Sequence, residues 1–344
     1  MSLRFAEAAA GPARCIPQPV LTPLVDLPVL PGAPDGVRIL GKLESGQPSG
    51  SIKDRPVRRM LEALRADGSL RGRRVLDSSS GNAGIAYAMY GALLGLPVTL
   101  VVPGNASRER LQRIRAHGAE LVLTDPLEGY DHAVREARRM AAENPGRYCF
   151  VDQYGNRENW RAHYEGTGAE ILRQARQQLG GAPDAFVCGV GTGGTLTGVG
   201  RRLRRAKPRT VLGVVVPEVF PGIEGLKPLG APDDIVPAIL DEGLIDARLP
   251  VPHERALEGC RALAAAGLFV GPSSGAFLWA ATELARQRPE LRTIVVPLCD
   301  TGERYGSSGM WEVDGLSSAP PAPPAPPTAA APRRSSPDQA RSEP

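Results

Sequence analysis

A lysine beside a tight turn is the first residue of this chain whose setting indicates chemistry. Lys53 follows Pro48-Ser49-Gly50-Ser51-Ile52, and apolar residues then recur at helical spacing from Val57 to Leu64. Lys53 is therefore predicted at a helix N-terminus, where the helix dipole disfavours an ammonium ion and lowers its pKa. The neutral amine is the form that condenses with an aldehyde to a Schiff base. Taken alone, this stretch fits a solvent-exposed lysine better, because most lysines are exposed.

Two polar, glycine-rich stretches accompany this lysine. Ser79-Ser80-Gly81-Asn82-Ala83-Gly84 lies between a predicted strand and a predicted helix. Gly191-Thr192-Gly193-Gly194-Thr195 follows an apolar run and precedes a helix, so its backbone N–H groups are suited to hold a phosphate. An amine for a Schiff base together with a phosphate loop predicts an enzyme built around pyridoxal phosphate.

The second of these loops has a competing interpretation. Gly189, Gly191 and Gly194 satisfy the GxGxxG pattern of a dinucleotide site, and Glu218 lies at roughly the distance expected for a residue that holds the ribose. An NAD-dependent oxidoreductase therefore stays as an alternative. It does not explain the two threonines of the loop or the lysine and asparagine stretches before it.

Strand and helix patterns alternate along most of the chain, which predicts an α/β fold with parallel sheets covered by helices. The segment 83–103 is apolar enough to suggest a membrane span, but Gly95-Leu96-Pro97 divides it into a helix and a strand. We therefore expect it in the core. The predicted strands are the apolar runs 74–77, 98–102, 120–123, 185–190, 211–216 and 293–298.

Composition and charge favour a globular protein. The chain has 344 residues, 42% of them hydrophobic, and a net charge of +4, and its basic cluster at 201–207 has the spacing of a solvated helix face. No nucleic-acid or membrane partner is expected. The five cysteines form no CxxC pair, so no metal is predicted, and Cys188 and Cys299 are expected as packed thiols. Residues 1–14 lack the apolar run of a secretory signal, which predicts a cytoplasmic location.

At this point the chain resembles a known family, the fold-type II pyridoxal-phosphate enzymes that replace a β-substituent. Within them it is similar to cysteine synthase (O-acetylserine sulfhydrylase) and to the cystathionine β-synthase family. The resemblance covers most of the chain. Beyond the lysine and the glycine loops it rests on Thr22-Pro23-Leu24-Val25, Lys42-Leu43-Glu44, Gln153-Tyr154-Gly155-Asn156, His163, Thr167-Gly168, Gly222-Ile223-Glu224-Gly225-Leu226-Lys227, Gly271-Pro272-Ser273-Ser274-Gly275-Ala276 and Asp300-Thr301-Gly302-Glu303-Arg304-Tyr305.

The resemblance implies a fold like that of the tryptophan synthase β-subunit. Two lobes, each with a twisted and mostly parallel sheet, would hold the cofactor in the cleft between them. The larger, cofactor-binding lobe would comprise residues 1–44 and 156–315, and the smaller, mobile lobe residues 45–155 with the substrate loop. A homodimer is also implied. The Pro- and Ala-rich tail, 316–344, is expected to be disordered because it has little to bury.

The resemblance also implies roles for individual residues. Lys53 would form the internal aldimine and later remove the substrate α-proton. Ser273 would face the pyridine nitrogen, and Asn82 would bond the ring hydroxyl. His163 is expected to be a structural hydrogen-bonding partner, and 300–305 supports the family without a chemical role. Gly191, Thr192, Gly193, Gly194 and Thr195 would bind the phosphate, and the substrate would contact Ser79, Ser80, Gly81, Asn82, Ala83 and Gln153.

The implied reaction forms L-cysteine from O-acetylserine, or another O-activated serine, and a sulfur donor through an aminoacrylate. The donor would be sulfide or a sulfur-carrier protein. Several departures leave the substrate open. Ala83 stands where cysteine synthases usually have threonine, Gln47 replaces a usual asparagine, and 214–217 lacks the usual Val-Glu-Pro ending. A serine or threonine dehydratase, a cystathionine β-synthase-like condensation and another β-substituted alanine synthase therefore remain alternatives. A non-enzymatic scaffold is kept as a separate alternative, against which the intact Lys53, Asn82 and Ser273 argue.

Overall fold

The computed structural model describes residues 18–79, 81–104, 106–230 and 235–311. The predicted substrate-loop residue Ser80 and the predicted disordered tail, 316–344, lie outside these residues. All the helices and strands that follow belong to one compact unit that ends at Met310.

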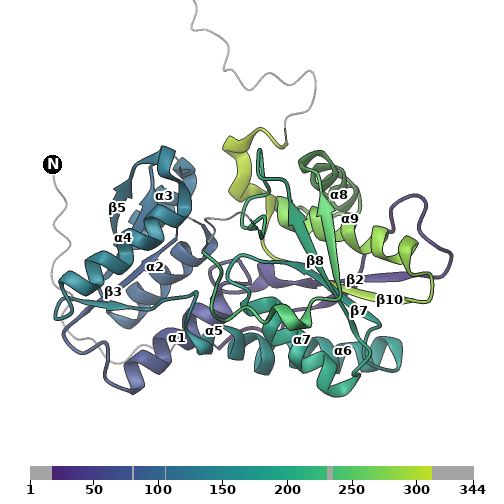
Figure 1. The fold of residues 1–344 in the computed structure, drawn as a ribbon, viewed down its shortest axis with the longest axis horizontal. Coiled ribbons are helices and arrows are strands. Elements are labelled where there is room, and N and C mark those ends of the chain that lie inside the picture. The colour runs from purple at the N-terminus through teal and green to yellow at the C-terminus, as the bar shows by residue number, and fades with distance from the viewer. Residues whose placement is uncertain (1–17, 80, 105, 231–234, 312–344) are drawn as a thin grey trace, which may run out of the picture. The chain divides into compact units, whose positions relative to one another are not determined.

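Within the described residues, the smaller sheet has four parallel strands in the order β5-β4-β3-β6, and Figure 1 labels β3 and β5 among them. Its central strand β4 is buried along its whole length, because helices cover both faces of the sheet. The strands are β3 (Arg74–Ser78), β4 (Val98–Pro103), β5 (Glu120–Thr124) and β6 (Tyr148–Phe150). The helices beside them are α1 (Asp54–Ala66), α2 (Asn82–Leu94), α3 (Arg108–Ala116) and α4 (Gly129–Glu143).

The larger sheet has six strands in the described part of the chain, in the order β1-β2-β10-β7-β8-β9, and β1 is antiparallel to its neighbour. Figure 1 shows α8 and α9 on one side of this sheet and α6 and α7 on the other. The strands are β1 (Leu24–Asp26), β2 (Arg38–Leu43), β7 (Ala185–Gly189), β8 (Val211–Pro217), β9 (Ala247–Val251) and β10 (Thr293–Leu298). The helices are α5 (Arg157–Ala162), α6 (Gly168–Leu179), α7 (Gly194–Ala206), α8 (His253–Ala265) and α9 (Pro272–Gln287). Short helices are η1 (Glu44–Gly46), η2 (Pro126–Glu128), η3 (His163–Thr167), η4 (Glu242–Leu244) and η5 (Gly302–Ser308).

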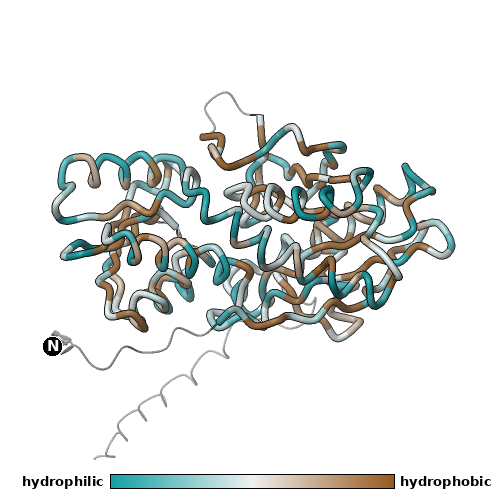
Figure 2. The backbone as a smooth tube through the Cα atoms, turned by 90° about the horizontal axis from the view of Figure 1, so that it is seen from below, coloured by the Kyte–Doolittle hydropathy of each residue, from teal (hydrophilic) through white to brown (hydrophobic). Residues whose placement is uncertain are grey.

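The predicted α/β architecture is confirmed. Each strand predicted from an apolar run corresponds to an observed strand, and the predicted and observed bounds differ by at most one residue. Figure 2 shows hydrophobic segments running through the interior of both groups of elements, with hydrophilic segments on the outer helices and loops. The segment 83–103 lies in α2 and β4 as expected, and no helix of the described residues is long and apolar enough to cross a membrane.

The chain passes from the larger sheet to the smaller one and back. It enters the smaller group with α1, leaves it with α5, and β10 finally pairs with β2. Strands of each sheet thus fall within the predicted lobes, whose exact boundaries stay a prediction. The carboxyl ends of the parallel strands are followed by the loops that carry the predicted site residues, as expected for ligand sites in such sheets.

Candidate active site

One buried carboxylate shapes the turn that places Lys53. Asp54, the first residue of α1, accepts hydrogen bonds from the Ser49 backbone N–H at 2.6 Å, the Ser49 hydroxyl at 2.5 Å and the Ser51 backbone N–H at 3.3 Å. Gly50 between these serines has a φ of +87°, which glycine adopts without strain. The turn therefore wraps around the start of α1 and holds Lys53 at its N-cap.

A buried ion-pair network anchors the same end of α1 to the larger sheet. The Arg55 guanidinium donates to Glu44 at 2.6 and 2.8 Å and to Glu170 at 2.7 and 2.8 Å. Lys42 also pairs with Glu170, at 2.7 Å. Arg55 and Glu44 are buried, but each charge has a bonded partner, which offsets the cost of removing it from water. The network therefore immobilises the helix turn that follows Lys53.

The Lys53 amine is poised for reaction. Burial lowers the pKa of Lys53, and the nearby Cys299 and Asp300 only partly oppose that shift. Among the residues that the structure describes, Lys53 Nζ has no hydrogen-bond partner. A Cβ placed on Gly191 would lie 3.9 Å from this Nζ, so the amine faces the predicted phosphate loop. The shift makes the neutral amine more accessible beside that loop than in an exposed lysine.

The loop Gly191–Thr195 joins β7 to α7 and has the form of an anion site. Gly193 is the N-cap of α7 with a φ of +81°. A Cβ on it would lie 2.8 Å from the Leu240 Cβ, so glycine is needed for space as well. Within the described chain, the N–H groups of Gly191, Thr192 and Gly193 donate to no other group. Free N–H groups at a helix start attract a phosphate.

Two side chains outside the loop hold its threonines. Asn159 Nδ2 donates to Thr192 Oγ1 at 3.1 Å and to the Gln153 backbone oxygen at 2.7 Å, which links the phosphate loop to the substrate residues. His163 Nε2 lies 3.4 Å from Thr195 Oγ1, and its Nδ1 lies 3.0 Å from a threonine hydroxyl of η3. Burial lowers the pKa of His163 well below its usual value, so a neutral ring with a structural role is favoured, as predicted.

The predicted substrate loop lies at the start of α2, which begins at Asn82. Ser79 Oγ accepts the Gly84 N–H at 3.0 Å and thereby caps this helix end. Gln153 Nε2 donates to the Ser78 backbone oxygen at 2.7 Å. Beneath both, Asp77 accepts the Gln153 N–H at 3.2 Å, and burial raises the pKa of Asp77 to about 7. Asp77 therefore supports the loop from inside the sheet.

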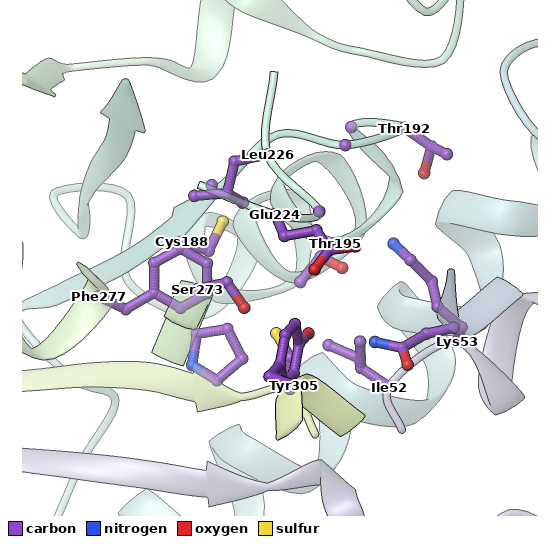
Figure 3. Close-up of a pocket in the computed structure, with 17 residues that line it drawn as sticks. Ile52, Lys53, Cys188, Thr192, Thr195, Glu224, Leu226, Ser273, Phe277 and Tyr305 are labelled. Atoms are coloured by element: carbon purple, nitrogen blue, oxygen red, sulfur yellow. The ribbon is translucent and has the colours of Figure 1, made fainter. Parts of the chain in front are cut away.

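These groups meet around a slot of ≈ 60 Å³ and an adjoining cavity of ≈ 670 Å³, which share Lys53 and Asn82 in their walls. Figure 3 shows Lys53 and Thr192 at one side of the slot and Ser273, Cys188 and Phe277 at the other. Of the predicted residues, the slot is lined by Lys53, Asn82, Gly191, Thr192, Gly193, Thr195 and Ser273, and the larger cavity also by Ser79, Gly81, Ala83 and Gln153.

Two thiols also face the slot. Cys188 lies at the end of β7 and Cys299 just after β10, and both line the slot beside Lys53. Burial raises the pKa of the Cys299 thiol to about 12 and that of Cys188 further, so both keep their protons near neutral pH. They are therefore packing groups rather than nucleophiles, in agreement with the prediction from the sequence.

The family model described as pyridoxal-phosphate dependent enzyme matches residues 17–300. The chain belongs to the pyridoxal-phosphate-dependent enzyme family. It is 45% identical over 284 residues to a cysteine synthase of Aquifex aeolicus, covering 81% of this chain and 85% of that protein. Its structure is similar to that of a cysteine synthase from Entamoeba histolytica, with a TM-score of 0.77, 32% identity and coverage of 90% and 95% of the two chains. It is also similar to an O-ureido-L-serine synthase, with a TM-score of 0.76, 35% identity and coverage of 88% and 95%.

The residues present fit the cofactor of this family. Free N–H groups of the glycine loop suit its phosphate, and the unpartnered Lys53 amine suits its aldehyde. The dinucleotide alternative finds no such support, because Glu218 lines neither the slot nor the larger cavity. The slot and the larger cavity adjoin, so the predicted residues that line either of them can contact one bound molecule. Gly194 does not line the slot; it packs against the Asn159 side chain, which a Cβ on Gly194 would overlap.

Sequence reasoning missed two residues that organise this site. Asp77 lies next to the last residue of β3, just before the substrate loop, and a carboxylate near the carboxyl end of a buried strand was a usable signal. Asn159 lies inside α5 and has no feature in the sequence that separates it from an exposed helix residue. Only the packing of α5 against α7 brings it to the phosphate loop.

Proposed function

We propose that this enzyme forms L-cysteine from O-acetylserine, or another O-activated serine, by replacing the β-substituent with sulfur from a sulfur donor. The observation that carries the proposal is the meeting, in one slot, of the free Lys53 amine and the free N–H groups of the glycine loop. The similarity to cysteine synthases over most of the chain supports the substrate class.

Bound pyridoxal phosphate supplies an electron sink that stabilises the charge left when the substrate loses its α-proton. Lys53 would hold the cofactor through its aldehyde and, as a neutral amine, would accept that proton at Nζ. Its lowered pKa supports this role. We assign Ser273 to the ring nitrogen, where a neutral hydroxyl does not hold a proton on the ring as a carboxylate does. Loss of a β-substituent is then favoured over transamination.

The substrate carboxylate is assigned to the loop at the start of α2 and to Gln153. The helix dipole at the start of α2 attracts an anion, and Ser79 and Gly81 line the cavity there. The bond from Gln153 Nε2 to the Ser78 backbone oxygen fixes the orientation of the Gln153 amide, and its second N–H remains for the substrate.

Ala83 supports a second candidate, a serine or threonine dehydratase. Its side chain is buried, with 4% exposed, and has no hydroxyl to donate to a substrate. A β-substituted alanine synthase with a different nucleophile is a variant of the first proposal, and the O-ureido-L-serine synthase above has a similar fold.

The test compares donors and nucleophiles on the purified protein loaded with pyridoxal phosphate. O-acetylserine with sulfide is expected to yield cysteine, and O-phosphoserine and serine are compared at the same concentration. Release of pyruvate and ammonia from serine, with no cysteine from any donor, would replace the synthase by a dehydratase. A protein that stays colourless after addition of the cofactor would refute both.

Assembly and sulfur source are further proposals that rest on the resemblance. We propose a homodimer, which sedimentation velocity tests directly through the mass of the particle. Sulfide is proposed as the donor, and a sulfur-carrier protein with a terminal thiocarboxylate is the alternative, tested by substituting it in the same assay. The cytoplasmic location stays a prediction.

A further inference from the structure

The amide of Asn82 is held on both of its polar atoms by charged residues of the segment after β10. Asn82 Nδ2 donates to Asp300 Oδ2 at 2.6 Å, and Arg304 Nη1 donates to Asn82 Oδ1 at 2.5 Å. A carboxylate only accepts hydrogen bonds and a guanidinium only donates them. The two partners therefore determine which amide atom faces which side, and a flipped Asn82 would oppose donor to donor and acceptor to acceptor.

Both partners are fixed by further contacts. The Tyr305 hydroxyl donates to Asp300 Oδ2 at 2.7 Å, and the second Arg304 nitrogen donates to the Ser49 backbone oxygen. Asp300 is 1% exposed and Arg304 8%. Gly271 closes the far side, since a Cβ there would overlap Asp300 Oδ1. The carboxylate and the guanidinium therefore have little freedom to follow a moving amide.

Asn82 lines both the slot and the larger cavity, beside Lys53. Its Nδ2 carries two hydrogens, and Asp300 occupies one of them. In the described part of the chain the other has no acceptor. An oriented donor with one free hydrogen thus borders the space where the cofactor ring is proposed to lie.

We propose that Asp300 and Arg304 are positioning residues that hold the Asn82 amide with its free N–H directed at the oxygen of the cofactor ring. The inference rests on the proposed function and on the role that the resemblance implies for Asn82, a hydrogen bond to that oxygen. It gives the segment 300–305 a chemical purpose. Asp300 contributes through its contact with Asn82, and Arg304 blocks the flip that would present Asn82 Oδ1 to the ring.

A double-mutant cycle tests this coupling. The variants are Asn82→Ala, Asp300→Asn and the double variant. The first quantity measured is the dissociation constant of pyridoxal phosphate, obtained by titration of the apo-protein. The second is the absorption maximum of the bound cofactor, which responds to hydrogen bonding at its ring oxygen. Each single change is expected to weaken binding about tenfold, the value of one charge-assisted hydrogen bond, and to shift the maximum in the same direction. The double variant is expected to match Asn82→Ala alone.

Additive effects of the two changes, or a normal maximum in Asp300→Asn, would overturn the inference. Asp184→Asn is the matched control, because Asp184 also accepts several bonds, including the Arg292 and Thr293 N–H groups at 2.9 and 2.8 Å, but does not line the slot. It is expected to lower stability and leave the maximum unchanged.

A second variant covers loss of folding in Asp300→Asn. Arg304→Lys keeps the positive charge but not the guanidinium geometry, and the same shift is expected from it; an unchanged maximum would count against the proposal. Failure of the proposed function looks different. In that case the wild-type protein itself would form no coloured complex, whereas failure of the positioning role leaves the wild-type complex normal.

Discussion

Replacing Gly194 with alanine is expected to lower stability and cofactor affinity, although Gly194 itself does not line the slot, because the added methyl group displaces Asn159. The added Cβ would overlap Asn159 Oδ1 and lie 2.8 Å from its Cγ. Asn159 is buried, so the side chain has little room to yield. Moving it breaks its bonds to the Gln153 backbone oxygen and to Thr192 Oγ1, which measure 2.7 and 3.1 Å.

The magnitude follows from these losses. Two hydrogen bonds contribute about 1 kcal/mol each, and a buried acceptor left unsatisfied at Gln153 costs about 1 kcal/mol or more. Alanine recovers up to about 1 kcal/mol because it favours a helix over glycine. The net decrease in the free energy of unfolding is therefore about 2 kcal/mol. Cofactor affinity should fall as well, because Thr192 loses the partner that positions it.

Urea denaturation of the apo-protein and titration with pyridoxal phosphate measure the two effects. Gly200→Ala is the matched control on the same helix, since its Cβ would lie 2.6 Å from a Leu212 methyl group in the core. It is expected to cost about 1–3 kcal/mol by overpacking and to leave cofactor affinity unchanged. A Gly194→Ala protein as stable as the wild type, with normal affinity, would refute the reasoning.

Three further predictions concern the lysine, the buried aspartate and the ion-pair network. Lys53→Ala is expected to lose turnover and to give no tagged peptide after borohydride reduction with the cofactor; a tag elsewhere with full turnover would move the assignment to another lysine. The pKa of Asp77 is raised to about 7 from 3.8, so its contribution to stability is complete below pH 4 and is lost as the pH rises through 7. At about 1.4 kcal/mol per pKa unit this amounts to about 4 kcal/mol, which Asp77→Asn should remove from the pH profile of the unfolding free energy; parallel profiles would contradict this. Glu44→Gln leaves Arg55 with one carboxylate in the interior and is expected to lower the free energy of unfolding by about 3 kcal/mol. Glu143→Gln, at the exposed pair with Arg139, is the control and is expected to lower it by less than about 1 kcal/mol. Equal losses of stability in thermal unfolding would argue against a buried network.

Much of the fold follows from local patterns that are visible in the sequence. Val98–Val102 is an uninterrupted run of β-branched residues and leucine, and Gly95-Leu96-Pro97 marks the end of the helix before it. Both β4 and the preceding helix α2 were therefore predictable. β1 and β6 were not, because each has three residues and exists through pairing with a longer strand. The larger sheet itself depends on such a pairing between distant segments, that of β10 with β2.

The sequence by itself determined which chemical groups this protein carries: an amine at a helix start, a glycine loop with free N–H groups and a serine at the start of α9. Each depends on neighbours a few residues away, which is the range over which turns and helix ends are specified. Only the tertiary structure decided how these groups are held, through Asn159 between the two loops and through Asp300 and Arg304 on Asn82. These contacts join residues up to 222 positions apart, and packing of the sheets and helices, rather than any local preference, brings them together.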